Sequence, residues 1–398
     1  MYNDINQDIK KYRKAEKLKK WRDEVQPIPW YFDGLENLCD RIHPEKQLLQ
    51  VTDIESLSHD TKLFRFISAE PKKALAPFRA GQYIGLTVEI NGVRTSRPFS
   101  IVSSPNQLAY YELGIKRKEG GFVSPYLLDN LKIGDIIEAT EPMGNFYYNP
   151  IFHGDNLVFI AGGSGITPFM SMLRNITERM FSLNVVLIFG CLTETDILFR
   201  EDLEEIQNRR PNIKVEYVLS ADPDWAGECG FITKDIISKY TGSIKEKYFY
   251  VVGNRDMYMF IQGELEAMGV PKHRILYEAY GVPEDITKIM GWPKEIDATK
   301  EIQITVDFIS QGRKEQKVFE ASCTEPLLNS LERTKELGYL INSGCRSGAC
   351  AFCRTKLVSG NVFVPPEVTI REVDQIFGYL HPCISYPITD IHLDLTLT

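Results

Sequence analysis

The sequence predicts a multidomain protein with an antiparallel β-barrel, a parallel α/β domain and a smaller C-terminal domain. Residues 47–149 contain short β-like segments with turn signals, residues 155–281 alternate between β and α patterns, and four cysteines follow residue 300 in a defined spacing. Short strands with frequent turns are typical of a small barrel, and alternating strands and helices are typical of a parallel sheet. The chain of 398 residues is long enough for such an arrangement.

The composition is that of an ordinary globular protein, with 43% hydrophobic and 25% charged residues. The net charge of −8 gives no general electrostatic support for nucleic-acid binding. No apolar run approaches the roughly 18 residues of a membrane helix. The charged N-terminus also lacks the pattern of a secretory signal. We therefore expect a cytoplasmic protein without a membrane span.

Residues 1–45 are predicted to form an N-terminal extension that contains a basic amphipathic helix. Eight Lys or Arg residues lie between Lys10 and Arg22 against a single acid, Glu16, and apolar residues recur at three- and four-residue steps. The helix is expected to end at Gln26, because two prolines follow. Such a helix could pack on its own protein, dock to an acidic partner or lie on a membrane surface.

Residues 46–150 are predicted to form the barrel. Four segments have the character of short strands: Leu48–Val51, Lys62–Ile67, Tyr83–Val88 and Tyr110–Ile115. Asn91-Gly92 follows the third segment and is a strong signal for a hairpin turn.

Residues 151–281 are predicted to form the parallel α/β domain, and residues 282–300 a linker. The expected strands and helices of the α/β domain, in order, are Leu157–Ile160, a helix after Thr167, Val185–Phe189, Ile197–Ile206, Tyr248–Val252 and Asp256–Met268. Thr167-Pro168 is expected to supply the N-cap and the first-turn proline of the first helix.

The C-terminal region carries cysteines in the ligand spacing of an iron–sulfur cluster. Cys345, Cys350 and Cys353 form a C-x4-C-x2-C array, and Cys383 follows. This is the plant-type spacing of a [2Fe–2S] cluster, whereas structural zinc usually shows two separated C-x2-C pairs and disulfides suit small secreted chains. On this array, residues 301–398 resemble a plant-type ferredoxin domain, which implies a β-grasp-like fold.

The remaining four cysteines are scattered along the chain. They are Cys39, Cys191, Cys229 and Cys323. We interpret them as buried or free thiols, which fits a reducing compartment.

Three further motifs stand in a fixed order. Arg97-Pro98-Phe99-Ser100 ends a predicted barrel strand, Gly120-Gly121-Phe122-Val123-Ser124 opens a short helix, and Ala161-Gly162-Gly163-Ser164-Gly165-Ile166-Thr167-Pro168 joins a strand to a helix. An arginine at a strand end can bind a diphosphate bidentately, and glycine-rich helix starts present N–H groups to anions. In this order, the motifs make residues 47–281 resemble the ferredoxin–NAD(P)+ reductase superfamily.

The resemblance implies a flavin site, with residues assigned through the matching motifs. Arg97 would bind the flavin pyrophosphate, Phe99 would lie against the ring, and the Ser100 hydroxyl near the flavin N5; Pro98 of the same motif is also expected at the cofactor. The backbone of Gly120, Gly121, Val123 and Ser124 would hold the diphosphate, which favours FAD and leaves FMN as the alternative. Glu278 and Tyr280 would lie near the flavin, and Ser100, Thr167 and Glu278 are the candidate catalytic residues.

A nicotinamide site follows from the same resemblance. The residues expected to contact the nucleotide are Gly162, Gly163, Gly165, Thr167, Gly253, Met257 and Asp222. Val252-Gly253-Asn254 stands where the family has Cys-Gly-Pro, so an apolar side chain replaces a sulfur. The loops with Glu194 and with Asp222 and Asp224 contain acids and no arginine, which suits a ribose diol better than a 2′-phosphate and favours NADH over NADPH.

Together these expectations describe an oxidoreductase that passes electrons from NADH through a flavin to a [2Fe–2S] cluster, and then singly to a partner protein. The domain order resembles reductases of Rieske-type oxygenases, of phenylacetyl-coenzyme A epoxidase and of hybrid-cluster protein. A diaphorase-like subunit or assembly module of a larger redox complex is the alternative from a different class.

Overall fold

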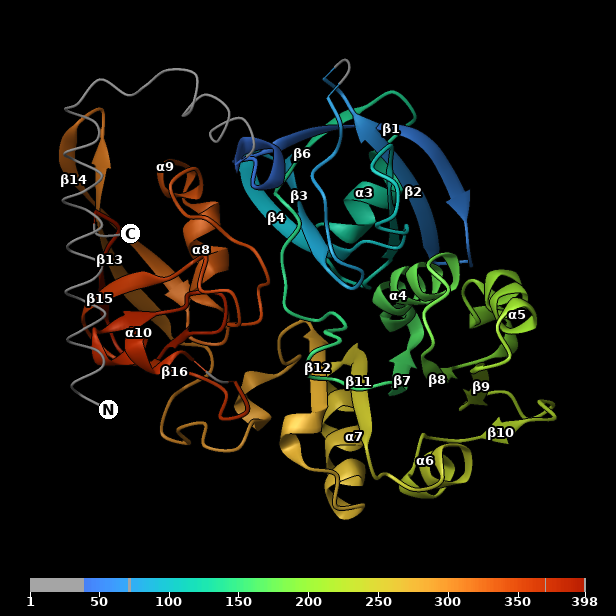
Figure 1. Cartoon of the computed structure of the whole chain (residues 1–398). Helices are drawn as coiled ribbons and strands as arrows, with labels where there is room; N and C mark the ends of the chain where they lie inside the picture. The colour runs from blue at the N-terminus through green and yellow to red at the C-terminus, as the bar shows by residue number, and fades with distance from the viewer. Residues whose placement is uncertain (1–38, 71–72, 369, 397–398) are drawn as a thin grey trace. The chain divides into compact units, whose positions relative to one another are not determined.

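A computed structural model describes residues 39–70, 73–368 and 370–396, without the side chains of residues 279 and 280 (Figure 1). The predicted basic helix that ends at Gln26 lies outside these residues. The chain from Lys46 onward forms one compact unit with three main sheets. Within the described residues, no helix is both long enough and apolar enough to cross a membrane.

The first sheet is antiparallel and closes into the predicted barrel. Its strands are β1 (Gln47–Ser56), β2 (Thr61–Ser68), β3 (Tyr83–Ile90), β4 (Val93–Ser100), β5 (Tyr111–Lys116) and β6 (Ile136–Ala139), in the order β4-β3-β6-β1-β2-β5. A bridge between Ile101 and Leu113 joins the two ends of this order. Asn91 and Gly92 have φ of 52° and 78°, so the predicted hairpin turn connects β3 and β4. Helix α3 (Ser124–Asn130) contributes Leu127 and Leu128 to the barrel core.

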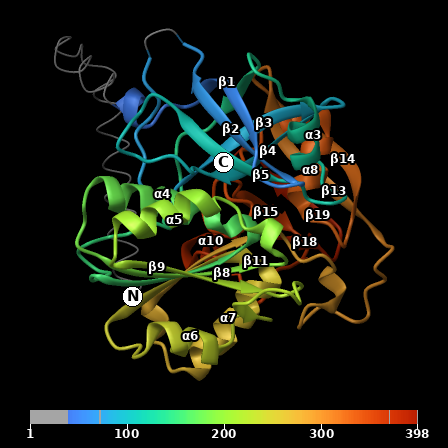
Figure 2. The ribbon, with the colours of Figure 1, turned by 90° about the vertical axis from the view of Figure 1, so that its right-hand side faces the viewer.

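The second sheet is parallel, as predicted, and has helices on both faces. Its strands are β7 (Asn156–Gly162), β8 (Asn184–Cys191), β9 (Ile213–Leu219), β10 (Glu228–Cys229), β11 (Lys247–Asn254) and β12 (Ile275–Tyr280), in the order β10-β9-β8-β7-β11-β12. Helices α4 (Ile166–Glu178) and α5 (Arg200–Arg209) cover one face, and α6 (Lys234–Thr241) and α7 (Arg255–Ala267) cover the other (Figure 2). Short 3₁₀ turns lie at Gly163–Gly165 (η1), Glu194–Asp196 (η2) and Lys272–Arg274 (η3).

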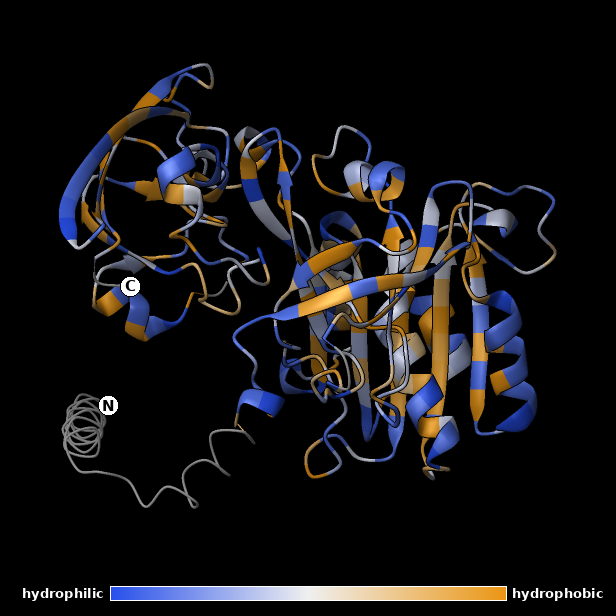
Figure 3. Ribbon diagram, turned by 90° about the horizontal axis from the view of Figure 1, so that it is seen from above, coloured by the Kyte–Doolittle hydropathy of each residue, from blue (hydrophilic) through white to orange (hydrophobic). Residues whose placement is uncertain are grey.

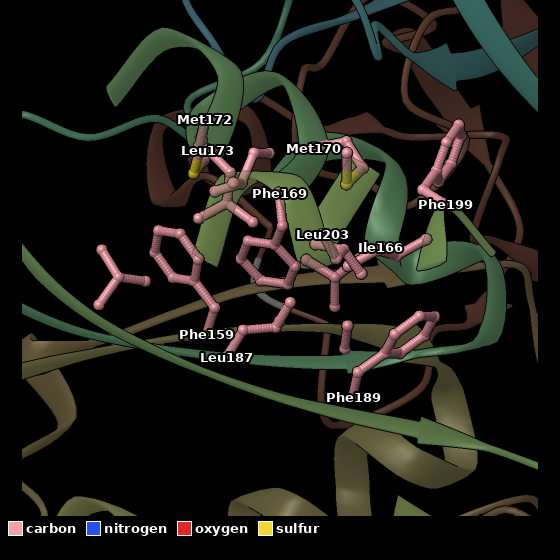
Figure 4. Close-up of a cluster of buried hydrophobic side chains, with 14 of the residues drawn as sticks. Phe159, Ile166, Phe169, Met170, Met172, Leu173, Leu187, Phe189, Phe199 and Leu203 are labelled. Atoms are coloured by element: carbon pink, nitrogen blue, oxygen red, sulfur yellow. The ribbon is translucent and has the colours of Figure 1, made fainter. Parts of the chain in front are cut away.

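The core of this domain explains why its central strands, β7 and β8, are apolar along most of their length. A parallel sheet that is covered on both faces buries the side chains of both faces, and its strands are coloured mostly hydrophobic in Figure 3. Phe159 of β7 stacks on Phe169 of α4 with 4.6 Å between ring centroids, and Leu187 and Phe189 of β8 lie in the same cluster (Figure 4). This packing fixes the position of α4, whose first turn reaches the functional site.

Two details of the predicted helices are wrong. Helix α4 begins at Ile166 with Gly165 as its N-cap, so Thr167 lies inside the first turn and its hydroxyl donates to the Ser164 carbonyl at 2.9 Å. Helix α5 begins at Arg200 rather than at Ile197, because Phe199 has a φ of 56° and turns the chain before the helix starts. In both cases a local backbone turn that the residue pattern does not show displaces the start of the helix.

The third sheet is mixed, and a helix packs its apolar side chains against the central strands, which is the β-grasp-like fold expected for the C-terminal domain. Its strands are β13 (Glu301–Ser310), β14 (Arg313–Ser322), β15 (Thr355–Ser359), β17 (Tyr379–Leu380) and β19 (Ile391–Asp394), in the order β14-β13-β19-β15-β17, and β16 (Val362–Phe363) pairs separately with β18 (Tyr386–Pro387). The helices are α8 (Leu327–Arg333), α9 (Lys335–Gly338) and α10 (Glu372–Ile376).

The segment interpreted as a linker, residues 282–300, contributes to the core of the C-terminal sheet. It contains the 3₁₀ turn η4 (Ile286–Lys288), and the side chains of Ile286 and Trp292 are buried in the same cluster as β13. The T-shaped contact between Trp292 and Phe363, at 5.2 Å between centroids, ties the segment to β16.

Candidate functional site

The four cysteines of the C-terminal domain lie in two pairs. The N–H of Cys350 is 3.3 Å from Cys345 Sγ, and the N–H of Cys345 is 3.4 Å from Cys350 Sγ. Cys353 and Cys383 are both buried and their side chains are hydrogen-bonded to each other. Within each pair the hydrogen bond lowers the pKa of one thiol and raises that of the other: the pKa of Cys345 falls to about 5 and that of Cys353 falls, whereas the pKa values of Cys350 and Cys383 rise.

This pairing fits a cluster with two irons, each bound by two thiolates. Among the described residues, no group of three or more His, Cys, Asp or Glu side chains is placed so that it could hold a metal ion. The environment also favours thiolates, because further backbone N–H groups point at sulfur: that of Ser347 lies 3.4 Å from Cys345 Sγ, and that of Phe352 lies 3.4 Å from Cys350 Sγ.

The cluster loop turns sharply at three positions with left-handed backbone, one of which is occupied by glycine. Arg346, Gly348 and Ala351 all have positive φ, at 53°, 81° and 57°. At Gly348 a side chain would also be crowded, because a Cβ would lie 2.8 Å from Val368. These turns direct successive N–H groups inward, toward the sulfurs.

A cavity of about 460 Å³ lies between the barrel, the start of α4 and the cluster loop. Its walls include nine of the residues predicted to bind the flavin or act near it: Arg97, Pro98, Phe99, Ser100, Gly120, Gly121, Val123, Ser124 and Thr167. Two of the cluster cysteines, Cys345 and Cys383, line the same cavity. The barrel motifs and the cluster loop therefore meet at one site.

Arg97 supplies a cation to this cavity that no described carboxylate neutralises at ion-pair distance. Its Nη1 donates to Thr95 Oγ1 at 2.6 Å and to the Ser96 carbonyl at 2.8 Å. Burial, and then the nearby Arg346 guanidinium, lower the pKa of Arg97 to about 10. Such a group remains charged at neutral pH, and a bound diphosphate would supply the missing counter-charge.

Close packing holds Thr167 at the cavity wall. A Cβ at Gly114 of β5 would lie 2.8 Å from Thr167 Cγ2, so only glycine lets α4 approach the barrel this closely. Ser100 and Thr167 are both buried at the cavity wall. Glu278 lies on β12 opposite Val252, outside the walls of the two cavities described here, and the backbone of Tyr280 pairs with that of Asn254.

A second cavity, of about 680 Å³, lies at the carboxyl ends of the parallel strands. Four residues predicted to contact the nucleotide line it: Gly162, Gly163, Gly253 and Met257. Met257 covers two of these glycines, because a Cβ on Gly162 or Gly253 would lie 2.1 or 2.6 Å from its Sδ. Gly165 does not line this cavity. It packs against β11, where a Cβ would lie 2.4 Å from the Val252 carbonyl oxygen.

Lys116, Phe231 and Phe260 line the cavities but were not predicted from the sequence, and Ser164 belongs to the predicted glycine-rich motif but was given no role of its own. Lys116 and Ser164 line both cavities, and Lys116 Nζ lies 3.2 Å from Asp60 Oδ2. Phe231 and Phe260 form an aromatic pair at the second cavity, with 5.9 Å between centroids. Phe231 is 72% exposed, so this large apolar side chain is open to a planar ligand.

Asp222 lies on the loop after β9 and not in the cavity wall. Its Oδ2 accepts a hydrogen bond from the Glu194 N–H at 3.0 Å, so it joins the two acidic loops. Arg200 of α5 forms an ion pair with Glu194 and another with Glu204, at 3.1 Å. The loops themselves contain no arginine, as their sequence shows, but the fold brings one beside them.

Three domain families match the chain in the order of the three sheets. They are an oxidoreductase FAD-binding domain at residues 48–148, an oxidoreductase NAD-binding domain at 159–263 and a 2Fe-2S iron-sulfur cluster binding domain at 311–387. The NADH-cytochrome b5 reductase 1 of Dictyostelium discoideum is 32% identical over 234 residues, which are 58% of this chain and 81% of that protein. The chain belongs to the ferredoxin–NAD(P)+ reductase superfamily, with a C-terminal [2Fe–2S] domain.

One curated relative of this reductase spans all three domains. The glycine betaine monooxygenase reductase subunit of Pseudomonas aeruginosa is 26% identical over 359 residues, which are 88% of this chain and 95% of that protein. Among solved structures, the cytochrome P450 reductase of Amycolatopsis is 28% identical with a TM-score of 0.54, and the match covers 60% of this chain and 70% of that one. Phthalate dioxygenase reductase shares the fold over 88% of this chain and 98% of that chain, with a TM-score of 0.64 and 21% identity.

The matched domains and the geometry agree on the cofactors. The reductase uses FAD, NADH and a [2Fe–2S] cluster, and it is an NADH-dependent flavin and iron–sulfur oxidoreductase. The uncompensated Arg97 cation fits a flavin diphosphate, and the paired cysteines fit the cluster.

Proposed function

We propose that this reductase is the electron-supplying component of an oxygenase system. The observation that carries the proposal is the first cavity, in whose wall the Arg97–Ser100 motif and the cluster ligands Cys345 and Cys383 stand together. When bound, FAD takes an electron pair from NADH and releases it in single steps, and the [2Fe–2S] cluster carries one electron at a time.

The residues of the two cavities have distinct roles in this proposal. Arg97 and the backbone at Gly120–Ser124 bind the FAD diphosphate, and Phe99 packs on the flavin ring. Ser100 of the barrel and Thr167 of α4 both line the first cavity and orient the reacting rings. Lys116 and Ser164 line both cavities and help to position the flavin and the nicotinamide relative to each other.

The nucleotide cavity supports binding of NADH in an extended form. Gly162, Gly163 and Gly253 allow the backbone to approach the nucleotide, and Met257 packs beside the nicotinamide. Phe231 and Phe260 offer a stacking surface for the adenine, which explains two large exposed aromatic side chains at a cavity mouth. Glu278 and Tyr280 stay candidates for contacts near the flavin, from the strand next to this cavity.

An oxygenase is the proposed acceptor because a curated relative that spans the whole three-domain order is a monooxygenase reductase subunit. Electrons can leave the cluster for the acceptor near Phe352. This side chain lies between the ligands Cys350 and Cys353 in the sequence and is 47% exposed, so it marks where the cluster loop reaches the surface. A reducing compartment such as the cytoplasm fits the chain, because Cys39, Cys191, Cys229 and Cys323 form no disulfide.

Reconstitution with an oxygenase tests this function. A Rieske-type oxygenase component purified from the same cells is expected to turn over with NADH only when the reductase is added, with NADH oxidation coupled to product formation. Reduction of ferricyanide and cytochrome c without support of any oxygenase component would contradict an oxygenase as the acceptor.

The nucleotide preference is a separate prediction. NADH should reduce the flavin with a kcat/KM about tenfold to a hundredfold above that for NADPH, because a 2′-phosphate near Glu194 and Asp222 meets like charge, a mismatch of about 1–3 kcal/mol. The guanidinium of Arg200 is already paired with Glu194 and Glu204. Asp222→Ala should narrow the preference, whereas Asp224→Ala, at an exposed position of the same loop, should change it less. Steady-state kinetics that show equal efficiency, or a preference for NADPH, would overturn the assignment.

A further inference from the structure

The strand that carries the flavin motif also holds the cluster loop. Ser96 of β4, directly before Arg97, has its Oγ 2.8 Å from Ser343 Oγ and 3.1 Å from the Ser343 carbonyl oxygen. The neighbouring Thr95 hydroxyl donates to Glu332 Oε2 at 2.9 Å. Ser343 stands two residues before the ligand Cys345, so one stretch of β4 reaches the flavin cavity and the cluster loop at once.

A buried ion pair completes this contact. Arg346, inside the cluster loop, donates from Nη1 to Glu332 Oε1 at 2.6 Å and from Nη2 to Glu332 Oε2 at 3.0 Å. Its Nη1 also reaches the Ser96 carbonyl at 3.3 Å, and its Nη2 donates to Asn329 Oδ1 at 2.6 Å. The side chains of Arg346 and Glu332 are only 11% and 5% exposed, so breaking the pair would leave a charge buried.

The partners of Arg346 separate its role from that of Arg97. Glu332 neutralises Arg346 and occupies both of its terminal nitrogens, whereas Arg97 has no carboxylate at ion-pair distance among the described residues. Arg97 is therefore the cation left for a diphosphate, and Arg346 is committed to joining the cluster loop to β4.

A second contact between the same domains is peripheral. The Tyr339 hydroxyl donates to Glu89 Oε2 at 3.0 Å, on the part of β3 that leads into the hairpin. Tyr339 is 56% exposed, and exposed polar contacts of this kind add little to stability. Tyr339 therefore offers a matched control for the buried contact.

We propose that Thr95, Ser96, Glu332, Ser343 and Arg346, here named the β4 contact, fix the separation of the flavin and the cluster and so set the rate of electron transfer between them. They are positioning residues, since none of them is a cysteine ligand or a member of the Arg97–Ser100 motif, and Arg346, which also lines the flavin cavity, has both terminal nitrogens bonded to Glu332. The inference rests on the proposed transfer from flavin to cluster. Electron transfer slows steeply as the distance between two centres grows, so partial opening of this contact lowers the rate without altering either cofactor.

A double-mutant cycle on the FAD- and cluster-loaded protein tests the inference. Ser96→Ala and Ser343→Ala remove the two sides of one hydrogen bond, and each is expected to slow cluster reduction about threefold after NADH has reduced the flavin. The double variant should be at most slightly slower than Ser96→Ala, because Ser96→Ala already removes the contacts with both the hydroxyl and the carbonyl oxygen of Ser343, and only the long 3.5 Å contact of Ser343 with Glu332 is lost in addition. Tyr339→Phe should keep the wild-type rate. Anaerobic stopped-flow absorbance follows the flavin and the cluster separately.

Further readouts distinguish positioning from other effects. Ser96→Ala should leave the reduction potential and the electron paramagnetic resonance spectrum of the cluster unchanged, and Glu332→Gln should slow transfer by more than Ser96→Ala because it leaves Arg346 without its counter-ion. Wild-type rates of cluster reduction in Ser96→Ala, Ser343→Ala and Glu332→Gln would overturn the inference. A cluster that NADH cannot reduce even in the wild-type protein would instead overturn the proposed function.

Discussion

Cys350→Ser is expected to abolish electron delivery from the reductase to a protein acceptor while flavin reduction by NADH stays near the wild-type rate. Cys350 is paired with Cys345 in the cluster loop. A serine hydroxyl is a poorer iron ligand than a thiolate, so the variant is expected to lose the cluster or to hold one that does not transfer electrons. The nucleotide cavity is lined by residues of the barrel and the parallel domain and contains none of the cysteine ligands. Stopped-flow absorbance and iron analysis of the variant measure the two effects independently.

Cys229→Ser is the matched control. This cysteine is exposed and lies on β10, far along the chain from the cluster loop, and its replacement should leave iron content and electron delivery unchanged. Loss of flavin reduction in a folded, flavin-loaded Cys350→Ser protein would contradict the order of transfer from NADH to flavin to cluster.

Arg97→Ala is expected to weaken flavin binding by about 3 kcal/mol, or roughly a hundredfold, because a bidentate, charge-assisted contact with the diphosphate is lost. Arg97→Lys should recover only part of the affinity, since an ammonium group cannot reproduce the two parallel hydrogen bonds of a guanidinium. Flavin titration of the apoprotein, followed by fluorescence, gives both dissociation constants. The flavin released from the wild-type protein by acid is expected to be FAD.

Arg94→Ala on the same strand separates this effect from general damage to β4. Arg94 pairs with Glu138 on the barrel surface and does not line the flavin cavity. Its replacement should leave the dissociation constant for FAD within about twofold, as expected of a surface ion pair. An Arg97→Ala protein that binds FAD as tightly as the wild type would remove Arg97 from the diphosphate site.

Local sequence signals were sufficient for the elements and for the motif residues that lie together. The spacing of Cys345, Cys350 and Cys353 lies within a single loop, and Asn91-Gly92 lies within a single turn. Each feature could therefore be predicted from residues that are adjacent in the sequence. The start of α4 was misplaced at Thr167 because the residue pattern does not show the 3₁₀ turn at Gly163–Gly165, which moves the N-cap to Gly165.

Contacts between distant segments could not be predicted in this way. Ser96 and Ser343 are 247 residues apart in the sequence, and no local pattern indicates that the strand of Ser96 contacts the cluster loop that includes Ser343. Arg200 enters the surroundings of Glu194 from a helix, so the absence of arginine in the loops did not describe the charge around them. Asp222 was assigned from its loop alone, and its side chain bonds the Glu194 backbone rather than lining the cavity.

The most direct test of the central claim is anaerobic stopped-flow of the wild-type protein, loaded with FAD and cluster, against excess NADH. The flavin absorbance should fall first, and the cluster absorbance should fall afterwards. Each protein molecule should accept one electron on the cluster in addition to the electrons held by its flavin. The reduced cluster should then give an electron paramagnetic resonance signal. A cluster that stays oxidised beside a fully reduced flavin, or one that is reduced before the flavin, would contradict the claim that electrons pass from NADH through the flavin to the cluster.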